Sequence, residues 1–211
     1  MTSVPDKKSM EPFEVSLHSI SLRRGERVLF ENLSLKLRAA DLLYVLGENG
    51  IGKTSLLLAM AGLLKPHEGQ ISFPDATTPA LSSSLMIQPD GASRGLTVLE
   101  DLKFMSNLSA TSNDPNALLK KVGLSDLTQN RTETLSLGQR KRLSLAKLLL
   151  GQRPLWLLDE PFSALDSEGR ALFAQEIARH LGRGGIAVIA THQPTEIPGS
   201  TNKILRLKAD R

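Results

Sequence analysis

The sequence contains no cysteine, so it can form neither a disulfide nor a thiolate metal site. This absence fits a reducing compartment. The first 13 residues lack the apolar segment of a signal peptide, and we expect none. Every apolar stretch is far shorter than the roughly 20 residues of a membrane-spanning helix. If the protein acts at a membrane, another chain therefore has to provide the crossing.

A strong excess of charge is missing as well. The formal net charge is +4 at pH 7, in a chain of 211 residues. A mild positive excess suits nucleic acid, ATP or an anionic membrane surface equally well, so charge does not choose a partner. The composition, 40% hydrophobic and 23% charged, is that of a globular domain with a substantial core.

The most informative segment present fits the phosphate-binding pattern G-x-x-x-x-G-K-[ST] at each fixed position. Its residues are Gly47, Glu48, Asn49, Gly50, Ile51, Gly52, Lys53 and Thr54. A buried strand is expected before it and a helix after it, which makes a chance match to a glycine-rich turn a poor alternative. Glycines let backbone N–H groups surround phosphate, and the helix N-terminus adds positive potential. We expect Lys53 to reach the β- and γ-phosphates and Thr54 to bind Mg²⁺.

Strand and helix patterns alternate along the chain. Residues 1–12 are expected to form a flexible tail, residues 13–37 two antiparallel strands with a turn near Gly25, and residues 74–84 a loop. Further strands are predicted at 42–46, 71–73, 84–88, 155–158, 186–190 and, at a sheet edge, 203–207. Helices are predicted at 55–61, 97–130 with a break at 109–115, 136–150 with Gly151 at its end, and 167–181. This order predicts an α/β fold with a mostly parallel sheet covered on both faces.

A pair of carboxylates, Asp159 and Glu160, follows the predicted strand 155–158. Side chains at the carboxyl end of a parallel strand face the crevice where ligands bind. Acidic pairs after strands are common, but beside the phosphate loop this pair indicates a catalytic site. We expect Asp159 to hold Mg²⁺ through water and Glu160 to act as the general base.

Four short motifs complete a resemblance to the ATP-binding cassette (ABC) ATPases. The sequence LSLGQ at 135–139 resembles their signature, SALD at 163–166 their D-loop, and His192 their switch histidine, while Gln88 stands at the Q-loop position. With the phosphate loop and the carboxylate pair, these motifs occur in the family's order. The resemblance covers the chain from about residue 13 to residue 207.

The resemblance implies a P-loop NTPase fold, with a mostly parallel core sheet, an antiparallel β subdomain and a helical subdomain at about 90–145. Residues 13–211 would form a single ABC ATPase domain. Its substrate would be ATP and its metal Mg²⁺, with Gln88 serving both the metal and catalysis. His192 would stabilise the phosphoryl group in transfer.

The resemblance also implies partners. Ser136 is expected to cap the signature helix and Gly138 to leave backbone N–H groups open to phosphate. Together with Gln139 they would contact ATP bound by a second copy, in a head-to-tail dimer, unless this segment is merely a helix start. An integral membrane permease would be the other partner, and no nucleic acid is expected.

A narrower resemblance is to the haem-exporter ATPases of cytochrome c maturation. It is found in the sequence at 156–166, in Thr-His-Gln-Pro at 191–194, and at 27–30. It implies a peripheral protein on the cytoplasmic face of the bacterial inner membrane. Many such proteins have histidine at the position of Gln88, which leaves open another small ABC exporter.

Two rival functions fit the sequence less well. Soluble ABC ATPases that act on DNA or ribosomes usually have a long coiled-coil insertion or two cassettes, and only about 45 residues separate Gln88 from the signature. A nucleotide-binding regulator without turnover is disfavoured by intact Lys53, Glu160 and His192.

Several other residues are expected to have less specific roles. The first turn lacks the aromatic residue on which ABC ATPases stack adenine, so Arg23 or Arg24 would stack instead, or the turn is simply solvated. Three histidines are expected to be structural or exposed: His18, His67 and His180. The segment 140–142 is expected on the solvated face of the signature helix, and Trp156 in the core.

Overall fold

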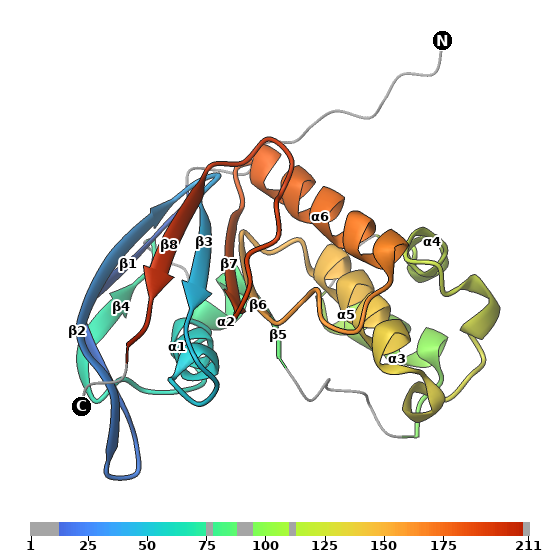
Figure 1. The fold of residues 1–211 in the computed structure, drawn as a ribbon. Helices are drawn as coiled ribbons and strands as arrows, with labels where there is room; N and C mark the ends of the chain where they lie inside the picture. Colours follow the sequence, from blue (N-terminus) through green and yellow to red (C-terminus); the bar gives the residue numbers. More distant parts are fainter. Residues whose placement is uncertain (1–12, 75–77, 88–94, 110–112, 209–211) are drawn as a thin grey trace.

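Two β-sheets lie on either side of a short helix in this computed structural model (Figure 1). The structure describes residues 13–74, 78–87, 95–109 and 113–208. The smaller sheet is antiparallel, in the order β2-β1-β4. Its strands are β1 Glu14–Arg24, β2 Arg27–Arg38 and β4 Glu68–Ser72.

The first two strands form the hairpin predicted for residues 13–37. Gly25 lies at the turn with a φ of 61°, a conformation that glycine adopts without steric cost. The strand predicted at 71–73 is β4, which begins three residues earlier. The tail predicted at 1–12 lies outside the described residues, and the division of the chain into a domain and a helical subdomain stays a prediction.

The larger sheet is parallel throughout and has the order β5-β6-β7-β3-β8. Its strands are β3 Leu42–Leu46, β5 Ser83–Met86, β6 Leu155–Asp159, β7 Ile186–Thr191 and β8 Asn202–Arg206. All five were predicted within a few residues, and β8 is at an edge as expected. The α/β architecture with a mostly parallel core sheet is therefore confirmed.

The parallel sheet separates two hydrophobic clusters. Along β3 the side chains alternate between them, as the period of a strand requires. Tyr44 joins the cluster formed with the larger helices, whereas Leu43 and Val45 join the cluster that includes α1 and β1. Both faces of the central strands are thereby buried, which explains their nearly continuous apolar sequences.

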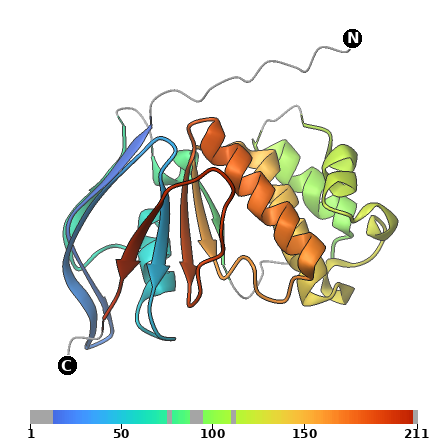
Figure 2. The ribbon, with the colours of Figure 1, turned by 45° about the horizontal axis from the view of Figure 1, so that its top comes forward.

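The helices divide between the two faces of the parallel sheet. They are α1 Lys53–Met60, α2 Pro79–Ser82, α3 Val98–Ser109, α4 Pro115–Lys121, α5 Leu137–Gly151 and α6 Ser167–Gly182, with 3-10 helices at Ser125–Leu127 and Thr132–Thr134. α1 packs between the two sheets, and α5 and α6 cover the opposite face (Figures 1 and 2). α3 and α4 lie beyond α5 and α6, away from the antiparallel sheet (Figure 2).

Two ion pairs with buried carboxylates connect these outer helices. Lys147 of α5 approaches Asp101 of α3 to 2.6 Å, and Lys121 of α4 approaches Glu176 of α6 to 2.8 Å. Both carboxylates are at most 2% exposed. Removal of either lysine would therefore take away an ionic partner of a buried negative charge and destabilise the fold. Among the helices described, none is both long and apolar enough to span a membrane.

Three local predictions of secondary structure were wrong. The helix predicted to run to residue 130 ends as α4 at Lys121, and a 3-10 helix follows at Ser125–Leu127. Part of the loop predicted at 74–84 is the short helix α2, because Thr78 caps it by accepting a hydrogen bond from the amide of Leu81 and Pro79 suits the first turn. The helix predicted to end with Gly151 continues through that glycine. Gln152 takes the left-handed conformation at the end instead, with a φ of 47°.

Candidate active site

Residues 47–54 form the loop that joins β3 to α1, as the sequence predicted. Gly47, Gly50 and Gly52 have φ values of 155°, 78° and 113°, which residues with a Cβ rarely adopt. A Cβ at Gly52 would also lie only 3.1 Å from that of Leu29 on β2. The glycines therefore allow both the shape of the loop and its close contact with the antiparallel sheet.

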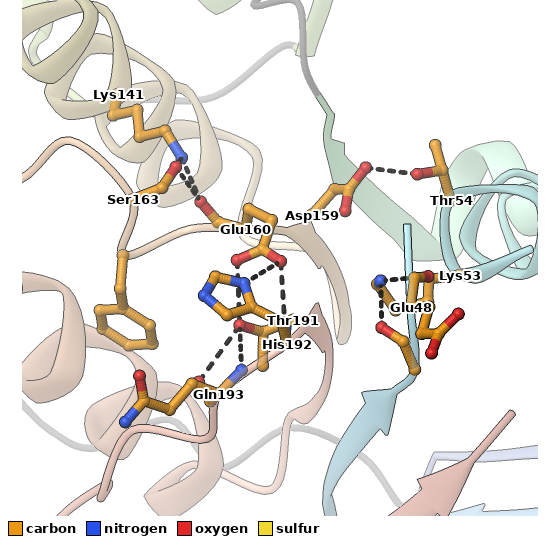
Figure 3. Close-up of polar contacts among 12 residues, drawn as sticks. Glu48, Lys53, Thr54, Lys141, Asp159, Glu160, Ser163, Thr191, His192 and Gln193 are labelled. Atoms are coloured by element: carbon orange, nitrogen blue, oxygen red, sulfur yellow. Dashed lines mark hydrogen bonds and ion pairs between the residues drawn. The ribbon is translucent and has the colours of Figure 1, made fainter. Parts of the chain in front are cut away.

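The side chain of Lys53 lies across this loop and is buried (Figure 3). Its Nζ donates to the carbonyl oxygens of Gly47 at 2.6 Å and Glu48 at 3.0 Å. Lys53 is also the first residue of α1, so a cation stands at the helix N-terminus with the N–H groups of the first turn. This is the environment in which a polyphosphate binds.

The next residue, Thr54, contacts the carboxylate at the end of β6. Its hydroxyl donates a 2.6 Å hydrogen bond to Oδ2 of Asp159 (Figure 3). Burial raises the pKa of Asp159, and the neighbouring Glu160 raises it further, while Thr54 and Lys53 oppose the shift. A hydroxyl and a carboxylate are the hard oxygen ligands that Mg²⁺ prefers when phosphates complete its coordination.

The carboxylate of Glu160 is held by the end of β7. Oε2 accepts from the hydroxyl of Thr191 at 2.9 Å, and Oε1 accepts from the backbone N–H of His192 at 3.1 Å. Nδ1 of His192 lies 3.0 Å from the same Oε1, and the histidine side chain is 71% exposed (Figure 3). A carboxylate and an exposed imidazole thus form one unit at the carboxyl edge of the sheet.

The segment 135–139 begins α5, and Ser136 is its N-cap. The Ser136 hydroxyl accepts from the amide of Gln139 at 3.2 Å, and the Gln139 side chain accepts from the amide of Ser136 at 2.9 Å. This reciprocal pair is a capping box. A Cβ at Gly138 would lie 2.9 Å from the carbonyl oxygen of Ala164, so glycine allows the D-loop to pass close to the helix start.

An open hollow of about 530 Å³ lies over this helix start. Its lining comes from the signature segment, from the turn after α4 and from the D-loop, at Gly123, Ser136, Leu137, Gly138, Gln139, Arg142, Ala164, Leu165 and Asp166. No residue of the loop 47–54 lines this hollow, so the loop and the start of α5 are two separate sites.

The sequence matches the family profile described as "ABC transporter" over residues 30–163. The chain belongs to the ABC transporter family. Its α/β fold, its binding of ATP and its activity as an ATPase follow from this membership.

The curated relatives of this ABC protein share most of its length. The cytochrome c biogenesis ATP-binding export protein CcmA of Rhizobium meliloti (strain 1021) is 40% identical over 86% of this chain and 92% of its own. The protein of that name from Rhodopseudomonas palustris (strain HaA2) is 42% identical over 88% and 94%. That of Haemophilus influenzae is 37% identical over 94% and 97%.

Solved ABC structures share the fold. A metal-chelate type ABC transporter in an inward-facing conformation gives a TM-score of 0.75 at 25% identity, over 93% of this chain and 80% of that chain. The ATP-binding protein of an ABC transporter from Pyrococcus furiosus gives 0.76 at 24% identity, over 91% and 97%.

One predicted site residue of the ABC ATPase, Gln88, lies outside the described residues. Its roles in catalysis and in Mg²⁺ binding stay predictions. The structure brings the other residues into two groups. Lys53, Thr54, Asp159, Glu160 and His192 converge at the carboxyl edge of the parallel sheet, and Ser136, Gly138 and Gln139 lie together in the hollow.

The prediction that residues 140–142 lie on a solvated helix face was wrong. Lys141 is only 2% exposed, and its Nζ donates to the Ser163 hydroxyl at 2.6 Å and to the carbonyl oxygen of Glu160. Arg142 donates to Asp166 at 2.9 Å. Position 141 precedes the buried Leu145 by four residues and therefore shares its helix face, a signal that was available in the sequence.

Sequence reasoning also missed Thr191 and Ser163, which bind the side chain and the main chain of Glu160. Other minor predictions were confirmed: Trp156 and His180 are buried, and His18 and His67 are exposed. Arg23 lies 3.6 Å from the carboxylate of Glu31, with both side chains partly exposed. This contact is compatible both with stacking of Arg23 on adenine and with a solvated turn.

Proposed function

We propose that this chain is the ATP-hydrolysing subunit of a bacterial export complex for cytochrome c biogenesis, with haem as the cargo. The observation that carries the proposal is the Glu160 carboxylate, held by Thr191 and His192 next to the Thr54–Asp159 pair. These groups are the ones that ATP hydrolysis requires. The similarity to named export proteins over most of the chain supports the biological setting.

The loop 47–54 would bind the phosphates of ATP. Lys53 would exchange its two carbonyl acceptors for β- and γ-phosphate oxygens, and the loop amides would donate to the same phosphates. Thr54 and Asp159 fit Mg²⁺ because their oxygens already lie 2.6 Å apart, and Gln88 would assist them. When bound, the ion would offset the negative charge of the phosphates.

Hydrolysis falls to Glu160 and His192. The water oxygen forms a bond to the γ-phosphorus as the bond to the β–γ bridging oxygen breaks, and ADP leaves with that electron pair. Glu160 accepts the proton of the water. Exposed His192, oriented through its contact with Glu160, would contact the phosphoryl group in transfer.

The hollow at Ser136, Gly138 and Gln139 suits the γ-phosphate of ATP bound by a second copy. The helix start around Gly138 would supply backbone N–H donors, and the hollow is open to solvent. Two chains would therefore associate head to tail with two ATP molecules between them. Association would act on an integral membrane permease at the cytoplasmic face of the inner membrane, with no nucleic acid involved.

The test is co-purification of the full chain with its membrane subunit, followed by assays of ATP hydrolysis and haem transport. We expect hydrolysis that depends on Mg²⁺ and a co-purifying membrane protein that handles haem. A membrane partner that handles a different cargo would support another small ABC exporter. Association with ribosomes or DNA in place of a membrane protein would contradict the proposal.

A further inference from the structure

The buried ammonium of Lys141 is a feature that the catalytic scheme does not yet use. Lys141 is 2% exposed, although a lysine is almost never buried unless its charge is compensated. Its Nζ donates to the hydroxyl of Ser163 and to the carbonyl oxygen of Glu160 (Figure 3). The side chain of Lys141 on α5 therefore points to the main chain of the segment that follows β6 and contains Glu160.

That main chain is under conformational strain. Glu160 has a φ of 46°, a left-handed conformation that is uncommon for a residue with a Cβ. Surrounding contacts must hold it there. The N–H of Glu160 donates to Ala190 at 2.9 Å, and its carbonyl oxygen accepts from the Ser163 hydroxyl at 3.0 Å as well as from Lys141. Both peptide groups that flank the Glu160 side chain are thus fixed.

The same lysine also connects two motifs of one chain. Ser136 caps the N-terminus of α5, and Lys141 lies little more than one turn further along the same helix. A displacement of the helix start would therefore move the group that holds the peptide of Glu160.

We propose that Lys141 is a positioning residue for ATP hydrolysis. Its ammonium holds the main chain of Glu160 in the left-handed conformation and so aligns the Glu160 carboxylate with the helix that bears Ser136. The proposal rests on the proposed function, because it assigns Lys141 a role in that reaction.

The first test compares Lys141→Met with Lys147→Met in the full chain. Methionine keeps the unbranched stem and removes the charge. Lys147 is a partly buried lysine on the same helix, and its ammonium pairs with Asp101 of α3. We expect Lys141→Met to lower kcat about a hundredfold, because small displacements of a catalytic group are costly. KM for ATP and the affinity for ATP should change by less than about twofold.

Lys141→Arg should recover part of the lost kcat, because it restores a cation with several donors. Lys147→Met should lower the unfolding midpoint and leave kcat within about twofold of the wild type. Equal loss of kcat in both methionine variants would reduce Lys141 to a general stabiliser of α5. Wild-type kcat in Lys141→Met would also overturn the proposal.

The second test does not depend on turnover. Amide hydrogen exchange of the segment 159–166 should be faster in Lys141→Met than in the wild type and unchanged in Lys147→Met. Unchanged exchange in Lys141→Met would contradict the positioning role. If the wild-type chain binds ATP yet does not hydrolyse it with its membrane partner, the proposed function is wrong, and the exchange measurement still decides whether Lys141 holds the loop.

Discussion

Nδ1 of His192 and Oε1 of Glu160 lie 3.0 Å apart, and the backbone N–H of His192 donates to the same oxygen. The two side chains assigned to hydrolysis therefore form one hydrogen-bonded unit at the end of β7. Thr191 holds the other oxygen of the carboxylate. A change in one member of this unit should be felt by the others.

Glu160→Gln should retain ATP binding and lose hydrolysis, because the base is removed while the phosphate loop is intact. General bases typically contribute about 10²–10⁴-fold to rate, so we expect a loss of this size. The ATP-bound dimer should accumulate, as measured by light scattering with ATP and Mg²⁺. A chain that stays monomeric with ATP and Mg²⁺, at a protein concentration well above the expected dissociation constant of the dimer, would contradict the head-to-tail dimer.

Ser136→Arg should stop turnover without abolishing ATP binding to the isolated chain, since its side chain would fill the hollow that receives the partner's γ-phosphate. Because Ser136 is also an N-cap, its loss costs about 1 kcal/mol of stability. Ser136→Asp is the control, since aspartate caps well but brings a negative charge toward phosphate. We expect the aspartate variant to fold normally and be inactive. Steady-state hydrolysis at the wild-type rate in either variant would make the signature assignment wrong.

Gly138→Ala should impair turnover through packing, because the new Cβ would lie 2.9 Å from the carbonyl oxygen of Ala164. The D-loop or the start of α5 would have to move, while ATP binding at the loop 47–54 should persist. Gly182→Ala in α6 is a matched control, since its Cβ would meet nothing within 4 Å. The control should be active and stabilised by up to about 1 kcal/mol. Equal activity of the two variants in an ATPase assay would contradict this reading of Gly138.

Base selectivity should be modest, because the first turn offers no aromatic residue to adenine. Base stacking on an aromatic ring is worth about 1–3 kcal/mol, and an arginine should supply no more. We expect GTP to compete with ATP more effectively than it does in ABC ATPases that have the aromatic residue. Arg23→Ala or Arg24→Ala should weaken ATP binding in a titration if that residue stacks. Unchanged affinity in both variants and in the double variant would support the solvated turn.

Stability should fall in mild acid because of His180. Burial lowers the pKa of His180 to about 4, and its ring stacks on Trp156 with centroids 4.1 Å apart. An unfolded histidine titrates near 6.5, so the unfolded chain binds more protons between the two values. The free energy of unfolding is therefore unaffected by this histidine above about pH 6.5. It decreases by about 3 kcal/mol as the pH falls toward 4.

The measurement is urea unfolding of His180→Gln and the wild type across this pH range. The glutamine variant should have a smaller pH slope, whereas His67→Gln, at an exposed position, should keep the wild-type slope. If the slope is the same in all three proteins, His180 does not account for the acid sensitivity.

The sequence predicted the features that depend on an apolar pattern or a local motif. Glycines at 47, 50 and 52 and the apolar strands around them were sufficient for the phosphate loop and the sheet, because local rules determine both. Lys141 was misplaced because its neighbours Arg140 and Arg142 suggested a charged surface, and only its alignment with Leu145 indicated burial. Thr191 and Ser163 could not be found in this way, since their roles depend on contacts across the sheet and along the D-loop turn.

The strand order has a consequence for how the chain folds. β3, which leads into the phosphate loop, pairs with β7 on one side and β8 on the other. Both partners lie at the opposite end of the sequence, so during synthesis β3 has to wait until more than 140 further residues have been added. The β1–β2 hairpin can close early, whereas the nucleotide site forms among the last parts of the protein, after long-range strand pairing. A ribosome-bound chain stalled before Ile186 should therefore bind no ATP, however complete its phosphate loop is.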